Sequence, residues 1–173
     1  RAAALVAGQC GSGLGATATA IANMQAVSER YGYAPQAFII VPVVGAFLID
    51  IANAIVISSA PYSSTVTTGS ATTDASDPAV GCGNGTRAKS VWYRFTAPSD
   101  GALTASTFGS NYDTILAAYT GACGAFAPVA GACNDDTSGA QSRISFAALG
   151  GTTYYFLVSA YSNNGGNLAF QLT

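Results

Sequence analysis

One long apolar run limits what this chain can fold into. Residues 37–57 read AFIIVPVVGAFLIDIANAIVI. As a single α-helix with a rise of about 1.5 Å per residue, this run would extend roughly 30 Å, which is the hydrocarbon thickness of a bilayer. A buried helix of a soluble protein is the alternative, but no second amphipathic segment is present to cover it. The run therefore predicts one transmembrane helix.

Two polar residues, Asp50 and Asn53, interrupt the second half of this run. An ionisable group deep in a bilayer is costly unless it faces protein or water. Asp50 would therefore lie near the outer interface, or it would belong to an ion or substrate path. The residues alone leave both interpretations open.

Composition divides the chain into two parts that suit different solvents. The 173 residues carry a net charge of −2, only 8% of them are charged, and none is histidine. Scattered basic residues disfavour nucleic-acid binding, and the lack of histidine removes the commonest general base. Residues 1–57 are nearly free of charge, whereas residues 58–173 are rich in Thr, Ser, Gly and Asn. We expect a membrane α-helical domain over 1–57 and an all-β domain over 58–173.

The segment before the apolar run contains closely spaced glycines at positions 11, 13 and 15. The G-x-G-x-G spacing is not a dinucleotide fingerprint, because no strand precedes it and no acidic residue follows about twenty positions on. One interpretation is an unwound stretch of a broken membrane helix, with Thr17, Thr19 and Asn23 supplying oxygens to a bound ion. The other is a glycine-rich packing face whose hydroxyls bond back to helix carbonyls.

Two strings in this part, CGSGLGATATAIANMQAVSERYG and QAFIIVPVVGAFLIDIAN, resemble the C-terminal end of the bacterial sodium/glutamate symporter family. The resemblance implies a broken or re-entrant segment followed by the last transmembrane helix, in a protein that moves glutamate inward with sodium. It implies an ion and substrate path at these positions: Gly11, Gly13, Gly15, Thr17, Thr19, Asn23 and Asp50. Ala18 departs from the family's usual proline, which weakens the expected helix break. The family has many spans, so these residues alone are not expected to transport.

The loop at residues 28–36, SERYGYAPQ, contains Arg30, and the next basic residue is Arg87. The positive-inside rule places such a loop in the cytoplasm. We therefore expect an inner-membrane protein, in contact with the lipid bilayer, whose chain after Ile57 lies outside the cell.

The second part of the chain alternates short apolar bursts with turn signals. Segments such as PSDG, GSNY and SNNGG offer the residues that tight reversals need. About seven strands at this spacing are typical of a β-sandwich. The expected strands lie within 62–73 and at 90–97, 101–108, 113–120, 142–149, 152–161 and 167–173.

Three strings in this part resemble the pre-peptidase C-terminal-like domains of secreted bacterial proteins: SVWYRFTAPSDGALTASTFGSNYDTILAAYTGACG, CNDD and GTTYYFLVSAY. The resemblance implies a jelly-roll-like sandwich that assists secretion, anchoring or adhesion to an extracellular polymer or protein. It also implies that the domain is not catalytic. From the residues, Ser106, Asp113 and Ser142 could be combined into an active site, but without histidine they have no evident general base.

Acidic residues in this part give a candidate cation site. Asp113 follows a tyrosine, and Asp135 and Asp136 belong to an NDD run. Calcium takes six to eight oxygen ligands, several of them from carboxylates and loop carbonyls. The alternative is that these residues only shape turns. Sodium, by resemblance to the symporters, and calcium are therefore the two ions that the sequence suggests.

The cysteines suggest a disulfide. Cys123 and Cys133 flank the short stretch GAFAPVAGA, and a disulfide in an oxidising compartment would close it as a loop. Cys82 is then left unpaired within the domain, with only Cys10 remaining. Sequences resembling this β-domain often have a cysteine where Ile51 stands here. We infer a junction between two unrelated genes near Ile51, produced by natural fusion or by an error of sequence assembly.

The leading hypothesis from the sequence is a C-terminal fragment of a sodium/glutamate symporter-like membrane protein that carries an extracellular β-sandwich. Glutamate and sodium would be partners only if the rest of the transporter is present. The alternative is a secreted or cell-surface adhesion module that begins near Asn53, with a foreign segment ahead of it. A soluble enzyme is the least favoured reading.

Overall fold

The computed structural model describes residues 54–73, 77–83, 87–122 and 125–173. The chain divides into two units, Arg1–Asn53 and Ala54–Thr173, and every described residue belongs to the second. Most of the expected transmembrane helix, residues 37–53, lies outside the described residues, as do the candidate path residues at positions 11–23 and 50. Within the described ranges, no helix is long and apolar enough to cross a membrane.

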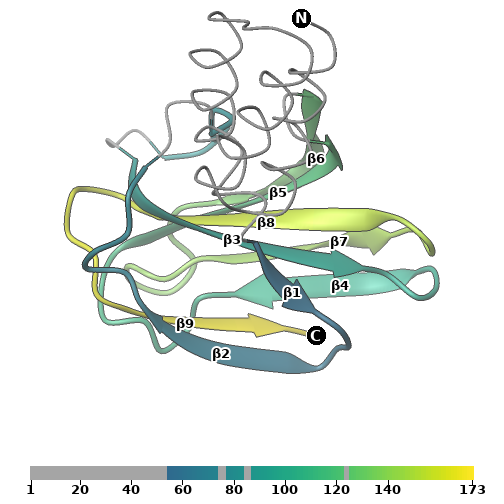
Figure 1. Cartoon of the computed structure of the whole chain (residues 1–173), viewed down its shortest axis with the longest axis horizontal. Helices are drawn as coiled ribbons and strands as arrows, with labels where there is room; N and C mark the ends of the chain where they lie inside the picture. Colours follow the sequence, from purple (N-terminus) through teal and green to yellow (C-terminus); the bar gives the residue numbers. More distant parts are fainter. Residues whose placement is uncertain (1–53, 74–76, 84–86, 123–124) are drawn as a thin grey trace, which may run out of the picture. The chain divides into compact units, whose positions relative to one another are not determined.

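The second unit is a β-sandwich, and its described residues form nine strands in two sheets (Figure 1). The larger sheet has five strands in the order β1-β3-β8-β5-β6, and the smaller sheet has four in the order β2-β9-β4-β7. The strands are β1 (Ile55–Ile57), β2 (Tyr62–Thr67), β3 (Ala88–Thr96), β4 (Gly101–Ser106), β5 (Thr114–Ala122), β6 (Ala125–Asn134), β7 (Arg143–Ala148), β8 (Thr153–Ala160) and β9 (Asn167–Leu172). The all-β prediction for this part is confirmed.

Strand β1 corrects the expected end of the transmembrane helix. Residues 55–57 do not continue a helix, because they pair in parallel with β3, with Ile55 opposite Tyr93 and Ile57 opposite Phe95. Ile57 is only 3% exposed and belongs to the sandwich core. The β-domain therefore begins ahead of the expected boundary at residue 58, within sequence that was assigned to the membrane.

The core lies between the two sheets and follows the alternation of each strand. On β3 the side chains of Val91, Tyr93 and Phe95 point inward, and on β9 those of Leu168 and Phe170 do so. The rings of Tyr93 and Phe170 stack across the two sheets with centroids 3.9 Å apart. Because the period of two puts every second residue on the inner face, short alternating bursts are enough to build this core.

The outer face of the larger sheet is also partly covered. Trp92 lies on the opposite face of β3 from Tyr93 and is nevertheless only 3% exposed. A segment that we call the strap, residues 77–83, contacts this face through Asp77, whose carboxylate accepts hydrogen bonds from Trp92 Nε1 at 2.9 Å and from the Ser90 hydroxyl at 2.6 Å. The Tyr119 hydroxyl donates to the Ala79 carbonyl at 3.2 Å. The strap therefore closes a second, smaller apolar layer on the sheet.

Candidate functional site

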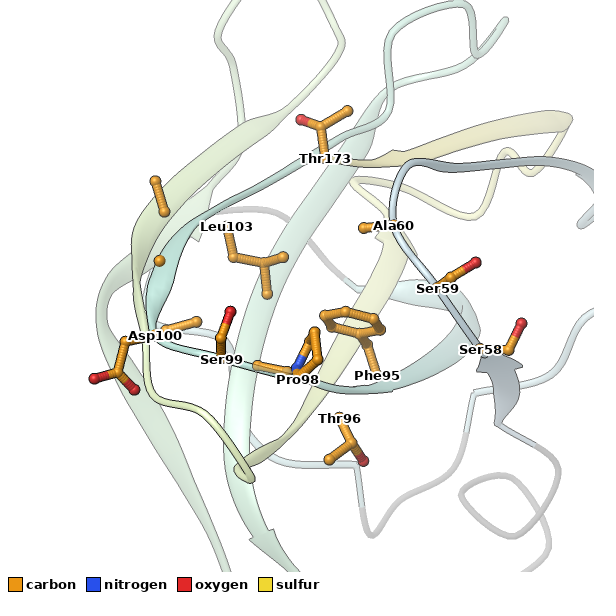
Figure 2. Close-up of a pocket in the computed structure, with 14 residues that line it drawn as sticks. Ser58, Ser59, Ala60, Phe95, Thr96, Pro98, Ser99, Asp100, Leu103 and Thr173 are labelled. Carbon is orange, nitrogen blue, oxygen red and sulfur yellow. The ribbon is translucent and has the colours of Figure 1, made fainter.

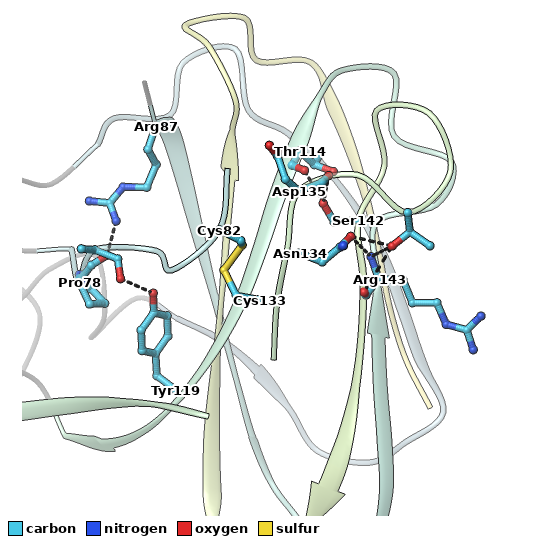
Figure 3. Close-up of a disulfide and its surroundings, with 12 residues drawn as sticks. Pro78, Cys82, Arg87, Thr114, Tyr119, Cys133, Asn134, Asp135, Ser142 and Arg143 are labelled. Carbon is cyan, nitrogen blue, oxygen red and sulfur yellow. Dashed lines mark hydrogen bonds between the residues drawn. A yellow bond between two sulfur atoms is a disulfide. The ribbon is translucent and has the colours of Figure 1, made fainter. Parts of the chain in front are cut away.

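A disulfide fastens the strap to the edge of the larger sheet. It joins Cys82 of the strap to Cys133 of β6, across a sequence separation of 51 residues (Figure 3). The predicted pairing of Cys123 with Cys133 is therefore wrong, and so is the prediction that Cys82 is unpaired. The prediction failed because residues 125–134 form one extended strand and do not fold back as a loop. A strand rises about 3.3 Å per residue, so the two ends of this strand are too far apart for a disulfide to close it as a loop.

Arg87 holds the start of the strap in place through hydrogen bonds. Its guanidinium donates to the carbonyl oxygens of Asp77, at 3.1 Å, and of Pro78. Figure 3 shows Arg87 and Tyr119 reaching the same short stretch of the strap from two sides. The strap thus holds its position through charged, polar and covalent contacts together, which suits a segment with no strand pairing of its own.

Three carboxylates meet beside this disulfide. One oxygen from each of Asp113, Asp135 and Asp136 lies within 4.8 Å of the others. Asp113 directly precedes β5, and Asp135 and Asp136 directly follow β6. Because β5 and β6 are antiparallel neighbours, with Leu116 opposite Asn134, the start of one strand lies next to the end of the other. We call these three residues the acidic cluster.

The hydrogen bonds around the acidic cluster hold its backbone. The Ser142 hydroxyl contacts the carbonyl oxygens of Thr114 and, at 2.6 Å, of Asp135, and its single hydrogen is donated to one of them at a time. Asn134 Oδ1 accepts from the Arg143 backbone N–H at 3.1 Å. Ser142 is fully buried and used in this way, so it offers no free nucleophile. The active site that the sequence allowed from Ser106, Asp113 and Ser142 gains no support.

The acidic cluster has unsatisfied oxygens. Asp113 Oδ1 and Asp135 Oδ1 are buried atoms without a hydrogen-bond partner in the described part of the chain. Burial raises the pKa of Asp113 and that of Asp135, and the charge of Asp136 raises both further. Gly83 of the strap packs so closely that a Cβ there would lie 2.9 Å from Asp135 Oδ2. Crowded carboxylates with unused lone pairs are a donor set that a hard cation satisfies.

A separate cavity of about 370 Å³ opens at one end of the sandwich, shown in Figure 2. Phe95 and Leu103 line it together with Pro98, and the hydroxyls of Ser58 and Ser59 stand at its edge. The acid that lines it is Asp100, whose carboxylate accepts a hydrogen bond from the Gly150 backbone N–H at 2.7 Å. The Asp100 carboxylate at this cavity therefore holds the backbone of the neighbouring loop at Gly150.

Sequence reasoning found the acidic cluster but missed the residues around it. Asp113, Asp135 and Asp136 were named from the sequence, and the structure brings the three together. Gly83 and the buried Asp77 were not named, because their roles depend on where the strap lies. The sequence signals there were an Asp-Pro step and a Gly-Cys-Gly triplet, which mark turns but identify no partners.

The class of protein follows from these features: a disulfide-pinned β-sandwich with an acidic cluster at one end, preceded by a segment of different composition. Comparison identifies that segment, because residues 1–33 match the family model described as sodium/glutamate symporter. The sodium/glutamate symporters of Escherichia coli (strain K12) and of Shigella flexneri are each 68% identical over 56 residues, which is 32% of this chain and 14% of theirs. That of Haemophilus influenzae (strain ATCC 51907 / DSM 11121 / KW20 / Rd) is 68% identical over 50 residues, 29% of this chain and 12% of its own.

The symporter resemblance is therefore confirmed for the first part of the chain, and the chain spans only 14% of the length of the first two of these relatives. Among solved structures, the pre-peptidase C-terminal domain of a collagenase from Bacillus anthracis is similar at a TM-score of 0.47 and 16% identity, over 70% of this chain and 95% of that one. The 56 residues matched by the symporters are close in length to the unit Arg1–Asn53. The family match over residues 1–33 and the separate unit that starts at Ala54 are consistent with a fusion of two modules.

Proposed function

We propose that this chain is the C-terminal part of a symporter-like membrane protein that holds a non-catalytic β-sandwich outside the cell as a binding domain. The observation that carries this proposal is the disulfide between Cys82 and Cys133. Disulfides form and persist in oxidising compartments and are rare in the bacterial cytosol. A symporter-like segment directly ahead of the sandwich supports attachment to the inner membrane.

In this proposal the two modules have separate tasks. Sodium and glutamate are ligands of a longer protein that contains the remaining spans. The residues proposed for its path are Gly11, Gly13, Gly15, Thr17, Thr19, Asn23 and Asp50. We therefore expect no transport from the 173 residues alone. The sandwich binds an extracellular polymer or protein.

A second candidate function is a secreted adhesion domain with a foreign segment ahead of it. The observation that favours it is that residues 54–173 form a unit with its own core, into which Ile57 is already built. Both candidates place the sandwich outside the cytoplasm, and they differ in whether the membrane retains it.

Fusion reporters test the placement. We expect alkaline phosphatase joined after Thr173 to be active in a bacterial host, because this enzyme becomes active only after export. A green fluorescent protein at the same place should be dark, because it does not become fluorescent after export. The chain should stay in the membrane pellet after an alkaline carbonate wash. Release by that wash would favour the secreted domain. If the green fluorescent protein fusion is fluorescent and the phosphatase fusion is inactive, both candidates are overturned.

We further propose that the acidic cluster binds calcium and that this stabilises the sandwich. The support is its geometry: one oxygen from each of the three carboxylates lies within 4.8 Å of the others, and buried oxygens of Asp113 and Asp135 have no hydrogen-bond partner among the described residues. Bound calcium would be held by these carboxylates and would neutralise their mutual repulsion. A cation at this position would link the start of β5 to the end of β6.

The cluster predicts opposite effects of pH with and without calcium. In EDTA, Asp113 and Asp135 bind protons more tightly in the folded state than in the unfolded state, because folding raises their pKa values. Their contribution to stability is present below the ordinary pKa of about 3.9 and is lost as pH rises through the raised values. Calcium binds the deprotonated carboxylates, so its stabilisation grows with pH, to about 2.7 kcal/mol at a hundred times its dissociation constant.

The measurement is urea unfolding followed by the fluorescence of Trp92, the single tryptophan of the chain, so the signal reports on the sandwich alone. Asp135→Asn should abolish most of the calcium effect and flatten the pH dependence seen in EDTA. Asp100→Asn makes the same chemical change outside the cluster and should leave both unchanged. An unchanged calcium response in Asp135→Asn would refute the site.

A further inference from the structure

The outer face of the larger sheet carries a groove beside β1 that lies apart from the acidic cluster and shares only Ser58 and Thr96 with the cavity of Figure 2. Its volume is about 450 Å³, and it is lined chiefly by Val56, Ser58, Arg94, Thr96, Thr153 and Tyr155. The register explains how these residues meet, since Val56 lies opposite Arg94 and Arg94 lies opposite Tyr155. With strands about 4.8 Å apart, this row extends roughly 10 Å across β1, β3 and β8.

Arg94 lies at the centre of the row. It is exposed on a strand whose neighbouring residues, Tyr93 and Phe95, are buried in the core. Its backbone is fixed by pairing on both sides, so the guanidinium has a defined origin and only its side chain moves. A guanidinium presents a planar set of donors that matches a carboxylate in a bidentate pair.

Tyr155 supplies an aromatic surface next to this charge. Its side chain is half-buried, and Phe126 packs edge-on against it with ring centroids 5.1 Å apart. Phe126 in turn stacks on Trp92 at 5.4 Å. The ring of Tyr155 is therefore held in place before any ligand arrives, which lowers the entropy cost of binding.

A pair of hydroxyls completes the groove. The side chains of Thr96 and Thr153, opposite each other on β3 and β8, are joined by a hydrogen bond of 2.9 Å. That bond uses one of the two hydroxyl hydrogens, which leaves the other free to donate to a ligand, together with unused lone pairs. The groove thus offers a cation, a ring face and hydroxyl groups on the neighbouring strands β3 and β8.

We propose that this groove binds an acidic polysaccharide through one uronate unit. The uronate carboxylate pairs with Arg94, the C–H face of the sugar ring packs on Tyr155, and the ring hydroxyls bond to Thr96 and Thr153. Charge complementarity favours an anionic ligand. The backbone groups of β3 and β8 at these residues are already paired between strands, so a peptide lying over these two strands finds no backbone partner there, whereas a saccharide needs only side chains.

The inference rests on the proposed function, because it needs the sandwich outside the cell. It is tested by isothermal titration calorimetry on the whole chain in a polyoxyethylene detergent, which contains no sugar. The probes are an oligogalacturonate, a neutral dextran of the same length and a poly-glutamate of the same charge. EDTA keeps calcium from bridging the ligand to the acidic cluster.

We expect the oligogalacturonate to bind and the dextran and poly-glutamate to bind at least about tenfold more weakly, a difference of about 1.4 kcal/mol. Arg94→Gln and Tyr155→Ala should each weaken binding by about tenfold or more, in keeping with the loss of a principal contact. Arg143→Gln removes the same charge from an exposed position on β7 of the smaller sheet and should leave binding unchanged.

Absence of oligogalacturonate binding would overturn the inference, as would equal binding of the dextran or the poly-glutamate. An equal loss in Arg143→Gln would also overturn it, since it would indicate general attraction to anions. Arg94→Gln alters an exposed side chain, so this variant still tests whether the groove binds the uronate if Tyr155→Ala fails to fold. If the phosphatase fusion is active and no polysaccharide binds, the proposed function stands and only this groove's ligand is wrong.

Discussion

Replacing Cys82 and Cys133 together by serine is expected to lower the free energy of unfolding of the sandwich by about 4 kcal/mol. The disulfide closes a loop with a sequence separation of 51 residues. In the chain-entropy model, a cross-link of that span removes about 14 cal/mol/K from the unfolded ensemble, which gives about 4 kcal/mol at room temperature. The measurement is the urea midpoint from Trp92 fluorescence, compared with that of the oxidised parent.

The strap adds a local effect to this loss. Cys82 is the link between the strap and β6, and Trp92 is covered partly through Asp77 of the same strap. We therefore expect the double variant, and the reduced parent, to show Trp92 emission shifted to longer wavelength in the folded state. A chain that keeps both its midpoint and its emission after reduction would contradict the role given to the disulfide.

Cys123→Ser is the control that separates the two pairings. If Cys133 pairs with Cys82, this variant keeps the cross-link and its stability, and a non-reducing digest still contains the peptide pair that joins Cys82 to Cys133. If the pairing expected from the sequence were right, Cys123→Ser would lose the cross-link. Mass spectrometry of the digest gives the answer without any assumption about stability.

Two of the strands that were predicted correctly, β2 and β9, have a clear period of two, so the pattern itself indicates the sheet. Strands β5 and β8 are buried along most of their length, and they were predicted from apolar bursts between turn signals. Strand β6 was missed because its alanines, Gly131 and Pro128 favour a loop, and because two cysteines ten residues apart suggest closure. Its position is set by pairing with β5, which no local pattern records.

Strand β1 was missed for a different reason. Ile55, Val56 and Ile57 stand at the end of a continuous apolar run, and such a run fits a buried strand as well as a membrane helix. Only the parallel pairing with β3 distinguishes the two. The position of the junction between the modules could therefore be predicted only to within several residues.

The acidic cluster could be predicted in part. Its three aspartates were recognised as possible calcium ligands because carboxylates stood at two turn positions, although they are about twenty residues apart in sequence. The sequence does not show that the two turns meet, because this depends on the antiparallel pairing of β5 and β6. The strap that packs against Asp135 could not be foreseen, since a disulfide with a distant cysteine decides where it lies.

Phe170→Ala is expected to have the other large effect, a loss of about 3–5 kcal/mol of unfolding free energy, as is usual for a fully buried aromatic residue. Phe170 has no exposed surface and lies on β9 of the smaller sheet. Its ring stacks on Tyr93 at 3.9 Å and packs on Phe156 at 5.8 Å, and both of these rings belong to the larger sheet. Removing it therefore leaves a cavity at the contact between the two sheets.

Leu149→Ala is the matched control, because Leu149 is a large apolar side chain that is 62% exposed. Truncating it should change the unfolding free energy by less than about 0.5 kcal/mol, since little buried area is lost. Urea unfolding of both variants, again followed through Trp92, gives the comparison. Phe170→Ala acts on the inner core and Cys82→Ser with Cys133→Ser on the outer layer, so the two losses should add in a combined variant. Equal small effects of Phe170→Ala and Leu149→Ala would mean that the two sheets do not pack through these rings.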